Sequence, residues 1–156
     1  MKTYPALWGN FLKWSSAVCS LLMLVPVFVP GWYGWIAPLV ILACVPFVIR
    51  GYSITSDAIL IRRLFWTTRL DRAGLLTAEP RPRAMKGSIR TFGNGGAFSI
   101  TGWFWSKSLG RYRAFVTDMK VTVVLRFNDR TVVLSPSDPD GFAAALQPVL
   151  SRSRGV

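Results

Sequence analysis

The stretch TFGNGGAFSITGWFWSKSLGRYRAF, residues 91–115, mixes glycines with aromatic and cationic side chains. Backbone amides of a glycine-rich loop can wrap phosphates, but a Walker loop requires G-x-x-x-x-G-K-[ST]. Here Gly102 precedes Lys107 at too short a spacing, and no second glycine stands before the lysine. A dinucleotide fingerprint begins at Gly93 but has Phe98 at its third glycine position. We therefore expect these glycines to supply positive φ angles and sharp bends, not a nucleotide site.

The aromatic and cationic residues of this stretch suggest a second kind of chemistry. Trp103, Phe104 and Trp105 are consecutive, so in a strand they cannot all face one core, and at least one must point outward. The cations close to them are Arg90, Lys107, Arg111 and Arg113. An exposed aromatic beside cations is typical of a surface at the lipid headgroup layer. The other interpretation, that Trp103 and Trp105 fill the sheet interior beside ordinary solvated charges, stays equally open.

A second basic cluster lies just before this stretch, in RPRAMKGSIR, residues 81–90. Arg81, Arg83 and Lys86 belong to it, and the prolines indicate a loop. These cations are either headgroup contacts or charges on a mobile solvated loop, and the pattern favours the loop.

Catalysis has little support in the sequence. The chain has no histidine, the commonest general base, and its 7 acidic residues fall mostly in turn or cap contexts. Asp138-Pro139-Asp140 resembles a carboxylate pair but also fits the start of a helix. Cys19 and Cys44 have no metal-ligand spacing and no histidine partner. We predict no catalytic residue, no metal and no cofactor.

A long uncharged segment precedes all of these residues. No charge occurs between Lys13 and Arg50, which favours a membrane anchor over a soluble fold. One helix through the whole gap would exceed a hydrocarbon core of about 30 Å. The proline and glycines of residues 30–34 allow a reversal, so we predict a transmembrane hairpin in residues 1–50, with spans of about 12–29 and 35–49.

The cations indicate how this hairpin is oriented. Lys2 and Lys13 flank the first span, while Arg50, Arg62 and Arg63 follow the second, and the turn is uncharged. The positive-inside rule then predicts a multi-pass protein of the bacterial inner membrane with both termini cytoplasmic. A cleaved signal peptide is the alternative, but no small-x-small site follows the first apolar run.

Beyond Arg50 the pattern is that of a β domain. YSIT and ILIRRLFW read as strands around the turn of residues 56–58, and residues 121–127 and 131–135 form a hairpin with one apolar face. Asp138 can cap a final helix that places Phe142, Ala145, Leu146 and Val149 on one stripe. Such a helix can close the open end of a small curved sheet. A basic tail, residues 151–156, follows.

Three phrases in residues 51–150 resemble the bacterial pleckstrin-homology (PH) domain family: YSITSDAILIRRLFWTTRLDRAGL, RTFGNGGAFSITGWFWSKSLGRYRAFVTD and VVLSPSDPDGFAAAL. The resemblance implies a bent seven-stranded sandwich or partial barrel capped by a C-terminal helix, following one or two membrane spans. PH folds serve both lipid and protein binding, so the resemblance alone fixes no ligand.

Charge adds a preference among partners. Without Lys2, Lys13 and Arg50, 16 of the 19 Lys and Arg remain in residues 51–156 against all 7 acids, a net charge of +9. A basic domain tethered directly to a bilayer favours anionic phospholipid, and no recognised motif indicates nucleic acid. We predict a non-catalytic membrane-surface module that binds anionic headgroups or a protein partner. The alternative is a structural or scaffold subunit of a membrane complex, with self-association through the spans or a strand edge also open.

Overall fold

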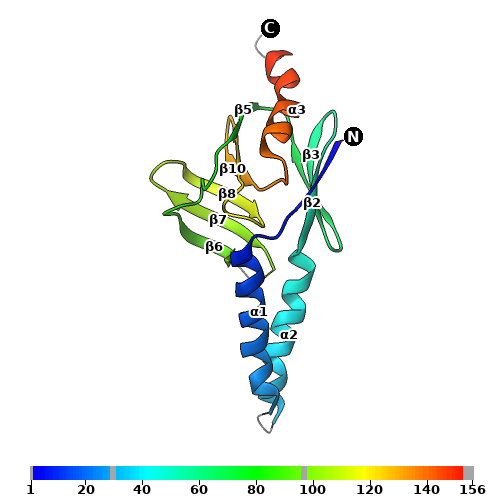
Figure 1. The fold of residues 1–156 in the computed structure, drawn as a ribbon, viewed down its shortest axis with the longest axis vertical. Coiled ribbons are helices and arrows are strands. Elements are labelled where there is room, and N and C mark those ends of the chain that lie inside the picture. The colour runs from blue at the N-terminus through cyan, green and yellow to red at the C-terminus, as the bar shows by residue number, and fades with distance from the viewer. Residues whose placement is uncertain (1, 29–30, 96–97, 153–156) are drawn as a thin grey trace.

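Two β-sheets stand above a helical hairpin in the computed structural model, which describes residues 2–28, 31–95 and 98–152 (Figure 1). The smaller sheet has four strands in the spatial order β1-β2-β3-β4. Its strands are β1 (Lys2–Pro5), β2 (Ile49–Ile54), β3 (Ala58–Arg63) and β4 (Thr67–Asp71). Every neighbouring pair in it is antiparallel.

The larger sheet has six strands in the order β5-β9-β10-β8-β7-β6. They are β5 (Leu75–Pro80), β6 (Ile89–Gly95), β7 (Ile100–Ser106), β8 (Gly110–Val116), β9 (Val123–Phe127) and β10 (Thr131–Leu134). The pairs are antiparallel except for β8 with β10. These mainly-β sheets with a C-terminal helix fit a PH-like domain, although the described residues form more strands than the seven expected.

One unexpected strand is β1, which lies before the hairpin in sequence. Lys2–Pro5 pairs with β2, and the ring of the buried Tyr4 packs edge-on against Phe142 at 5.1 Å between centroids. The Tyr4 hydroxyl donates to the Gly141 carbonyl at 2.9 Å. Residues expected only to flank a membrane span therefore complete the β domain, and four residues carry too short a pattern to predict this pairing.

The main core lies between the two sheets and the C-terminal helix α3 (Pro139–Arg152). The predicted cap is confirmed, because the Gly141 amide donates to Asp138 Oδ1 at 2.9 Å and α3 begins at Pro139. Phe142 and Leu146 are fully buried, and Ala145 packs against the same core. The side chain of Val149 and residues 153–156 of the predicted tail lie outside the described residues.

A second apolar cluster covers the other face of the six-stranded sheet. Val124 and Val133 belong to it, together with Leu12 of the hairpin and Met85 of the loop 81–88. The prediction that the β9–β10 hairpin has a single apolar face was therefore wrong. A strand covered on both faces has apolar residues at consecutive positions, and this is what the run of residues 123–125 encodes.

The segment before β2 forms two adjacent helices that extend away from the sheets (Figure 1). The first is α1 (Asn10–Leu24), continued by a 3-10 turn, Val25–Phe28. The second is α2 (Ile36–Cys44), with 3-10 turns Trp32–Trp35 before it and Val45–Phe47 after it. The second helical segment ends earlier than the predicted span, because Ile49 is already the first residue of β2 and pairs with Arg63 of β3.

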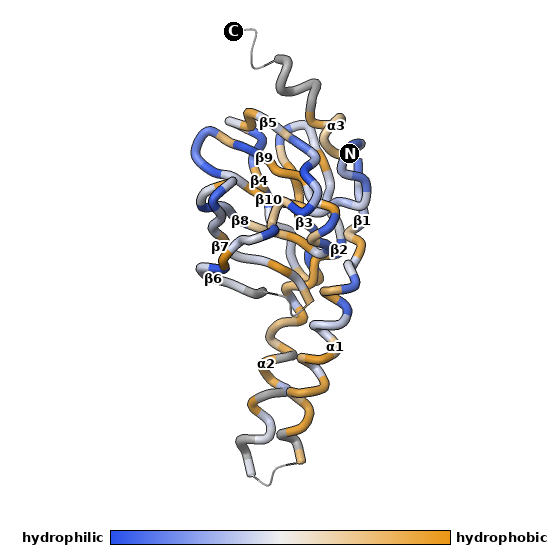
Figure 2. The backbone as a smooth tube through the Cα atoms, turned by 60° about the vertical axis from the view of Figure 1, so that its left-hand side comes forward, coloured by the Kyte–Doolittle hydropathy of each residue, from blue (hydrophilic) through white to orange (hydrophobic). Residues whose placement is uncertain are grey.

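Most residues of the hairpin are hydrophobic, as the orange colour along its two helices shows (Figure 2). Large exposed apolar side chains on it include Phe11, Trp14, Leu21, Leu22, Phe28, Leu39 and Leu42. Of the helices described, none is by itself long and apolar enough to cross a membrane.

The hairpin is joined to the domain by specific hydrogen bonds. The Gly9 amide, just before α1, donates to the Thr117 carbonyl at 3.1 Å, and the Thr117 hydroxyl donates to the Leu7 carbonyl at 2.9 Å. The Phe98 amide, in the β6–β7 connection, donates to Ser16 Oγ within α1 at 2.9 Å. The base of α1 is thereby held against the six-stranded sheet.

A buried polar network around Tyr52 connects the two sheets. The Tyr52 hydroxyl on β2 donates to the Phe115 carbonyl on β8 at 2.8 Å and lies 3.3 Å from Ser135 Oγ. Ser135 Oγ in turn accepts from the Thr117 amide at 2.7 Å. Burial raises the pKa of Tyr52 to about 12, with the Ser135 hydrogen bonds opposing the rise.

This pKa predicts loss of stability at alkaline pH. Between pH 10 and 12 unfolded Tyr52 is ionised while folded Tyr52 keeps its proton, so stability is full below pH 10 and falls as pH rises towards 12. The fall is about 1.4 kcal/mol per pH unit. We expect urea unfolding of the full chain in detergent micelles to show this decline, and Tyr52→Phe to show a shallower one. Equal slopes for the two proteins would contradict the assignment to Tyr52.

Candidate functional site

The pairing of β7 with β8 gathers four of the residues singled out in the sequence. Trp103 lies opposite Arg113, and Trp105 lies opposite Arg111, so all four side chains share one face of the sheet. The guanidinium of Arg111 lies 4.9 Å from the Trp103 ring centroid, and that of Arg113 lies 5.9 Å from it. Both contacts are within cation–π range.

Phe104 occupies the opposite face and is the buried member of the aromatic triplet. Its ring stacks on Tyr112 at 5.9 Å, and the Tyr112 hydroxyl donates to Ser88 Oγ at 2.6 Å. Burial raises the pKa of Tyr112, with the Ser88 hydrogen bond opposing the rise. Trp103 is half-buried and Trp105 is 42% exposed, so these two tryptophans do not fill the sheet interior.

The remaining candidates lie elsewhere. Arg90 pairs opposite Phe104 and so belongs to the other face of the sheet. Lys107 is exposed in the turn between β7 and β8. The structure therefore brings Trp103, Trp105, Arg111 and Arg113 together on one face, places Arg90 on the other face and leaves Lys107 in the turn.

The second basic loop is folded into consecutive turns. The Arg81 amide donates to the Thr122 carbonyl at 2.9 Å, and the Ala84 amide donates to Thr122 Oγ1 at 3.1 Å. Arg81, Arg83 and Lys86 are exposed, while Ala84 and Met85 are buried in the second cluster. The three cations thus lie on a loop that hydrogen bonds hold to Thr122, on the face of the sheet opposite Trp103.

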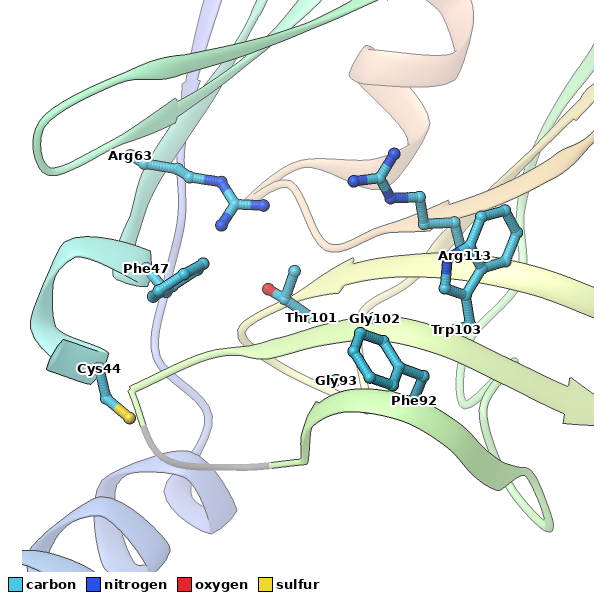
Figure 3. A pocket seen from close by; sticks show the side chains of 9 residues that line it. All are labelled: Cys44, Phe47, Arg63, Phe92, Gly93, Thr101, Gly102, Trp103 and Arg113. Carbon is cyan, nitrogen blue, oxygen red and sulfur yellow. The ribbon is translucent and has the colours of Figure 1, made fainter. Parts of the chain in front are cut away.

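A pocket of about 360 Å³ opens beside this aromatic and cationic face, between the base of the hairpin and both sheets (Figure 3). The hairpin contributes Cys44 and Phe47, and the strands contribute residues of β3, β6, β7 and β8. Arg63 at the end of β3 and Arg113 on β8 are its two charged residues. Figure 3 shows their guanidinium groups directed towards one another across the pocket.

Arg63 has an unusual environment. Its side chain is 7% exposed, and its Nε atom has no hydrogen-bond partner. Its guanidinium contacts the rings of Phe47 and Trp66, both at 5.6 Å, and of Phe115 at 5.3 Å. Burial, and then the positive charge of Arg113, lower the pKa of Arg63 from its ordinary value, although arginine stays protonated in proteins.

Our sequence reasoning used Arg63 only as an orientation charge and missed this role. A signal was present, because Ile59, Ile61 and Arg63 alternate along β3 and share the buried face. A charge at the end of an inward-facing series indicates either a buried partner or a ligand. Phe47 could not be found in this way, since its place in the pocket depends on how the hairpin packs.

Two glycines form part of the pocket wall and allow β6 and β7 to approach closely. Gly93 has φ 113° and Gly102 has φ 149°, and they pair with one another. A Cβ on Gly93 would lie 2.4 Å from the Thr101 carbonyl oxygen, and one on Gly102 would lie 2.2 Å from that of Phe92. The expected positive φ angles are present, but Gly93 and Gly102 lie within paired strands and allow a close crossing instead of forming a turn, while Gly96 lies outside the described residues.

Comparison with protein families agrees with this architecture. A family model described as the bacterial PH domain matches residues 50–150 of the 156-residue chain. The chain belongs to the bacterial PH domain family. Neither a curated protein nor a solved structure matches it. The match begins after α2, so the hairpin and β1 lie outside it.

Family membership suggests a binding role for this PH-like domain, since PH domains are generally non-catalytic binding modules. Within the part of the chain that the structure describes, no group of three or more His, Cys, Asp or Glu residues could hold a metal ion. The described chemistry is that of arginines, aromatic rings and an apolar pocket.

The two faces of β7 predict different costs of truncation. Phe104→Ala should lower the free energy of unfolding by about 3–5 kcal/mol, because it leaves a cavity beside Tyr112. Trp105→Ala should cost about 1 kcal/mol or less, since this ring is partly exposed. Urea unfolding of both variants in detergent micelles measures the difference. Similar large losses would show that Trp105 has a structural role and would remove it from the candidate site.

Proposed function

We propose that this protein is a membrane-anchored, non-catalytic binding module in which the hairpin inserts into a bilayer and holds the PH-like domain at its surface. The observation that carries the proposal is the apolar exterior of the hairpin. Trp14, Leu21 and Leu42 are each at least 66% exposed, and no charged residue occurs between Lys13 and Arg50. Contiguous apolar surface of this kind is unfavourable in water and is suited to lipid.

The dimensions of the hairpin are compatible with insertion when its turns are included. The 15 residues of α1 extend about 22 Å, and the four residues of the following 3-10 turn add about 8 Å. The sum is close to a hydrocarbon core of about 30 Å, but Leu12 and Ser16 of α1 contact the domain, so only the part of this length beyond Ser16 is free to lie in hydrocarbon. The proposal therefore rests on α1 and its 3-10 continuation together, since α1 alone is too short.

The connection between hairpin and domain supports a surface location. Only Val48 separates the last turn of the hairpin from β2, so the domain cannot move far from the anchor. Figure 1 shows β6 as the strand of the larger sheet nearest the hairpin. Ile89 and Phe92 on β6 are exposed, and basic residues flank them. Apolar side chains beside cations suit the headgroup layer, where each cation contributes about 1 kcal/mol near anionic lipid.

Insertion predicts resistance to alkaline carbonate. The full chain in vesicles of phosphatidylethanolamine and phosphatidylglycerol should float with lipid after a carbonate wash. A variant with Leu21→Arg and Leu39→Arg should be released, because each arginine at a helix centre costs roughly 2.5–3.5 kcal/mol. The matched control, Leu76→Arg with Ala144→Arg, adds the same charge at exposed positions of β5 and α3 and should still float. Release of the unmodified chain would refute insertion.

The proposed orientation, with the domain on the cytoplasmic side of a bacterial inner membrane, predicts the accessibility of the β9–β10 turn. Asp129→Cys places a thiol at an exposed position of this turn, in a background with Cys19→Ala and Cys44→Ala. An impermeant maleimide should label it only after spheroplasts are lysed. Labelling in intact spheroplasts would place the domain outside the cell and would restore the signal-peptide interpretation.

A further inference from the structure

We propose that the Arg63–Arg113 pocket is a binding site for one anionic phospholipid, with its phosphate between the two guanidinium groups and its apolar part against the base of the hairpin. This inference rests on the proposed function and deepens it by naming the site and the ligand class. The site is distinct from the diffuse attraction of a basic surface, because it depends on two particular side chains.

Arg63 carries a buried positive charge that no acidic side chain among the described residues compensates. No carboxylate among the described residues pairs with Arg63 or Arg113, since the ion pairs found there are Arg69–Asp57 and Arg130–Asp129. A buried cation without a partner is costly, and buried charges in proteins are normally paired. The missing negative charge is therefore expected from a ligand.

Arg72, a second buried arginine in the same domain, provides a comparison. It too is 7% exposed, with two nitrogens lacking partners. Its Nη1, however, donates to the Thr55 carbonyl at 2.5 Å, and Asp57 is near enough to influence it. Arg63 has neither kind of partner among the described residues, and its guanidinium points into a pocket (Figure 3).

Aromatic rings lie against both guanidinium groups. The Phe115 ring lies 5.3 Å from the Arg63 guanidinium carbon and 4.8 Å from that of Arg113, so one buried ring contacts both groups. Rings stabilise guanidinium groups but accept none of their hydrogen bonds in the manner of an oxygen. The donor forks are left available, and such forks match the oxygens of a phosphate.

The pocket also has an apolar part, which lies next to the base of the hairpin. Phe47 and Cys44 line the side next to the hairpin, and Phe92, which is 76% exposed, lines the side next to β6. With the hairpin in a bilayer, this opening lies where headgroups meet hydrocarbon. A ligand with an anionic head and an apolar body satisfies both parts, whereas inorganic phosphate would leave the apolar surface uncovered.

The test uses the full chain in non-ionic detergent micelles, titrated calorimetrically with dihexanoyl phosphatidic acid. We expect saturable binding that Arg63→Met and Arg113→Met each weaken by at least about tenfold, as expected for loss of charge-assisted hydrogen bonds. Arg62→Met is the matched control, because Arg62 is the next residue on β3 and is exposed on its other face. It removes the same charge and should leave the affinity unchanged.

Stability separates a binding role from a structural one. Without lipid, Arg63→Met should unfold at the same temperature as the unmodified chain or at a higher one, because methionine keeps the apolar stem and removes the unpaired charge. Marked destabilisation by Arg63→Met would indicate a structural charge and would overturn the assignment. If Arg63→Met does not fold, Arg113→Met decides the affinity test, since its guanidinium is less buried.

Two further titrations identify the source of the phosphate. Inorganic phosphate and glycerol 3-phosphate should bind at least about tenfold more weakly than the lipid, because they lack the apolar part. Equal affinity for these anions would overturn the lipid assignment. Equal lipid affinity in both arginine variants would overturn the site but leave the membrane anchor intact, since carbonate flotation tests the anchor separately.

Discussion

The hydroxyl of Tyr52 is the point at which the two sheets are held in one arrangement. It joins β2 of the smaller sheet to the Phe115 carbonyl on β8 of the larger sheet, and through Ser135 it reaches Thr117. Thr117 in turn forms hydrogen bonds with Leu7 and Gly9, which immediately precede α1. Because these groups are buried, each unmade hydrogen bond would cost the desolvation of a polar atom. The network therefore fixes the sheets and the hairpin relative to one another.

The pocket depends on this constraint, because its two arginines come from different sheets. Arg63 ends β3, the strand next to β2, and Arg113 lies two residues before the Phe115 carbonyl that Tyr52 binds. Neither sheet alone could bring the two guanidinium groups together. The ring of Phe115 belongs to the core and contacts both guanidinium groups, so it connects the core to the two arginines of the pocket.

Local patterns predicted the elements that local forces determine. The cap at Asp138, the burial of Phe142 and Leu146 on α3 and the pairing of β9 with β10 are encoded within a few residues, and the structure has them. The PH-like architecture followed from three longer phrases and is supported by the family match. The β1 pairing, the second apolar face and the Phe47 wall were missed, because each depends on contacts between segments that no local sequence pattern connects.

The candidate site was predicted in part for the same reason. The register of one hairpin placed Trp103, Trp105, Arg111 and Arg113 together, whereas Arg90 lies opposite Phe104 on the other face of the sheet and Lys107 lies in the turn between the strands. Side-chain direction, which alternates along a strand, separates neighbours that composition groups together. Arg63 lay far from this stretch and could be placed beside it only by the packing of the two sheets.

The reciprocal glycines of β6 and β7 have a consequence for how this sequence can evolve. A methyl group on either glycine would need space that the backbone of the opposite strand already occupies. Both glycines also have backbone angles that other residues rarely adopt. Replacing Gly93 first produces a clash with backbone, and so does replacing Gly102 first. Changing both adds the clashes instead of relieving them. A substitution at either position alone therefore strains the strand crossing, and we expect the residues around the pocket to tolerate change more readily than this pair of glycines.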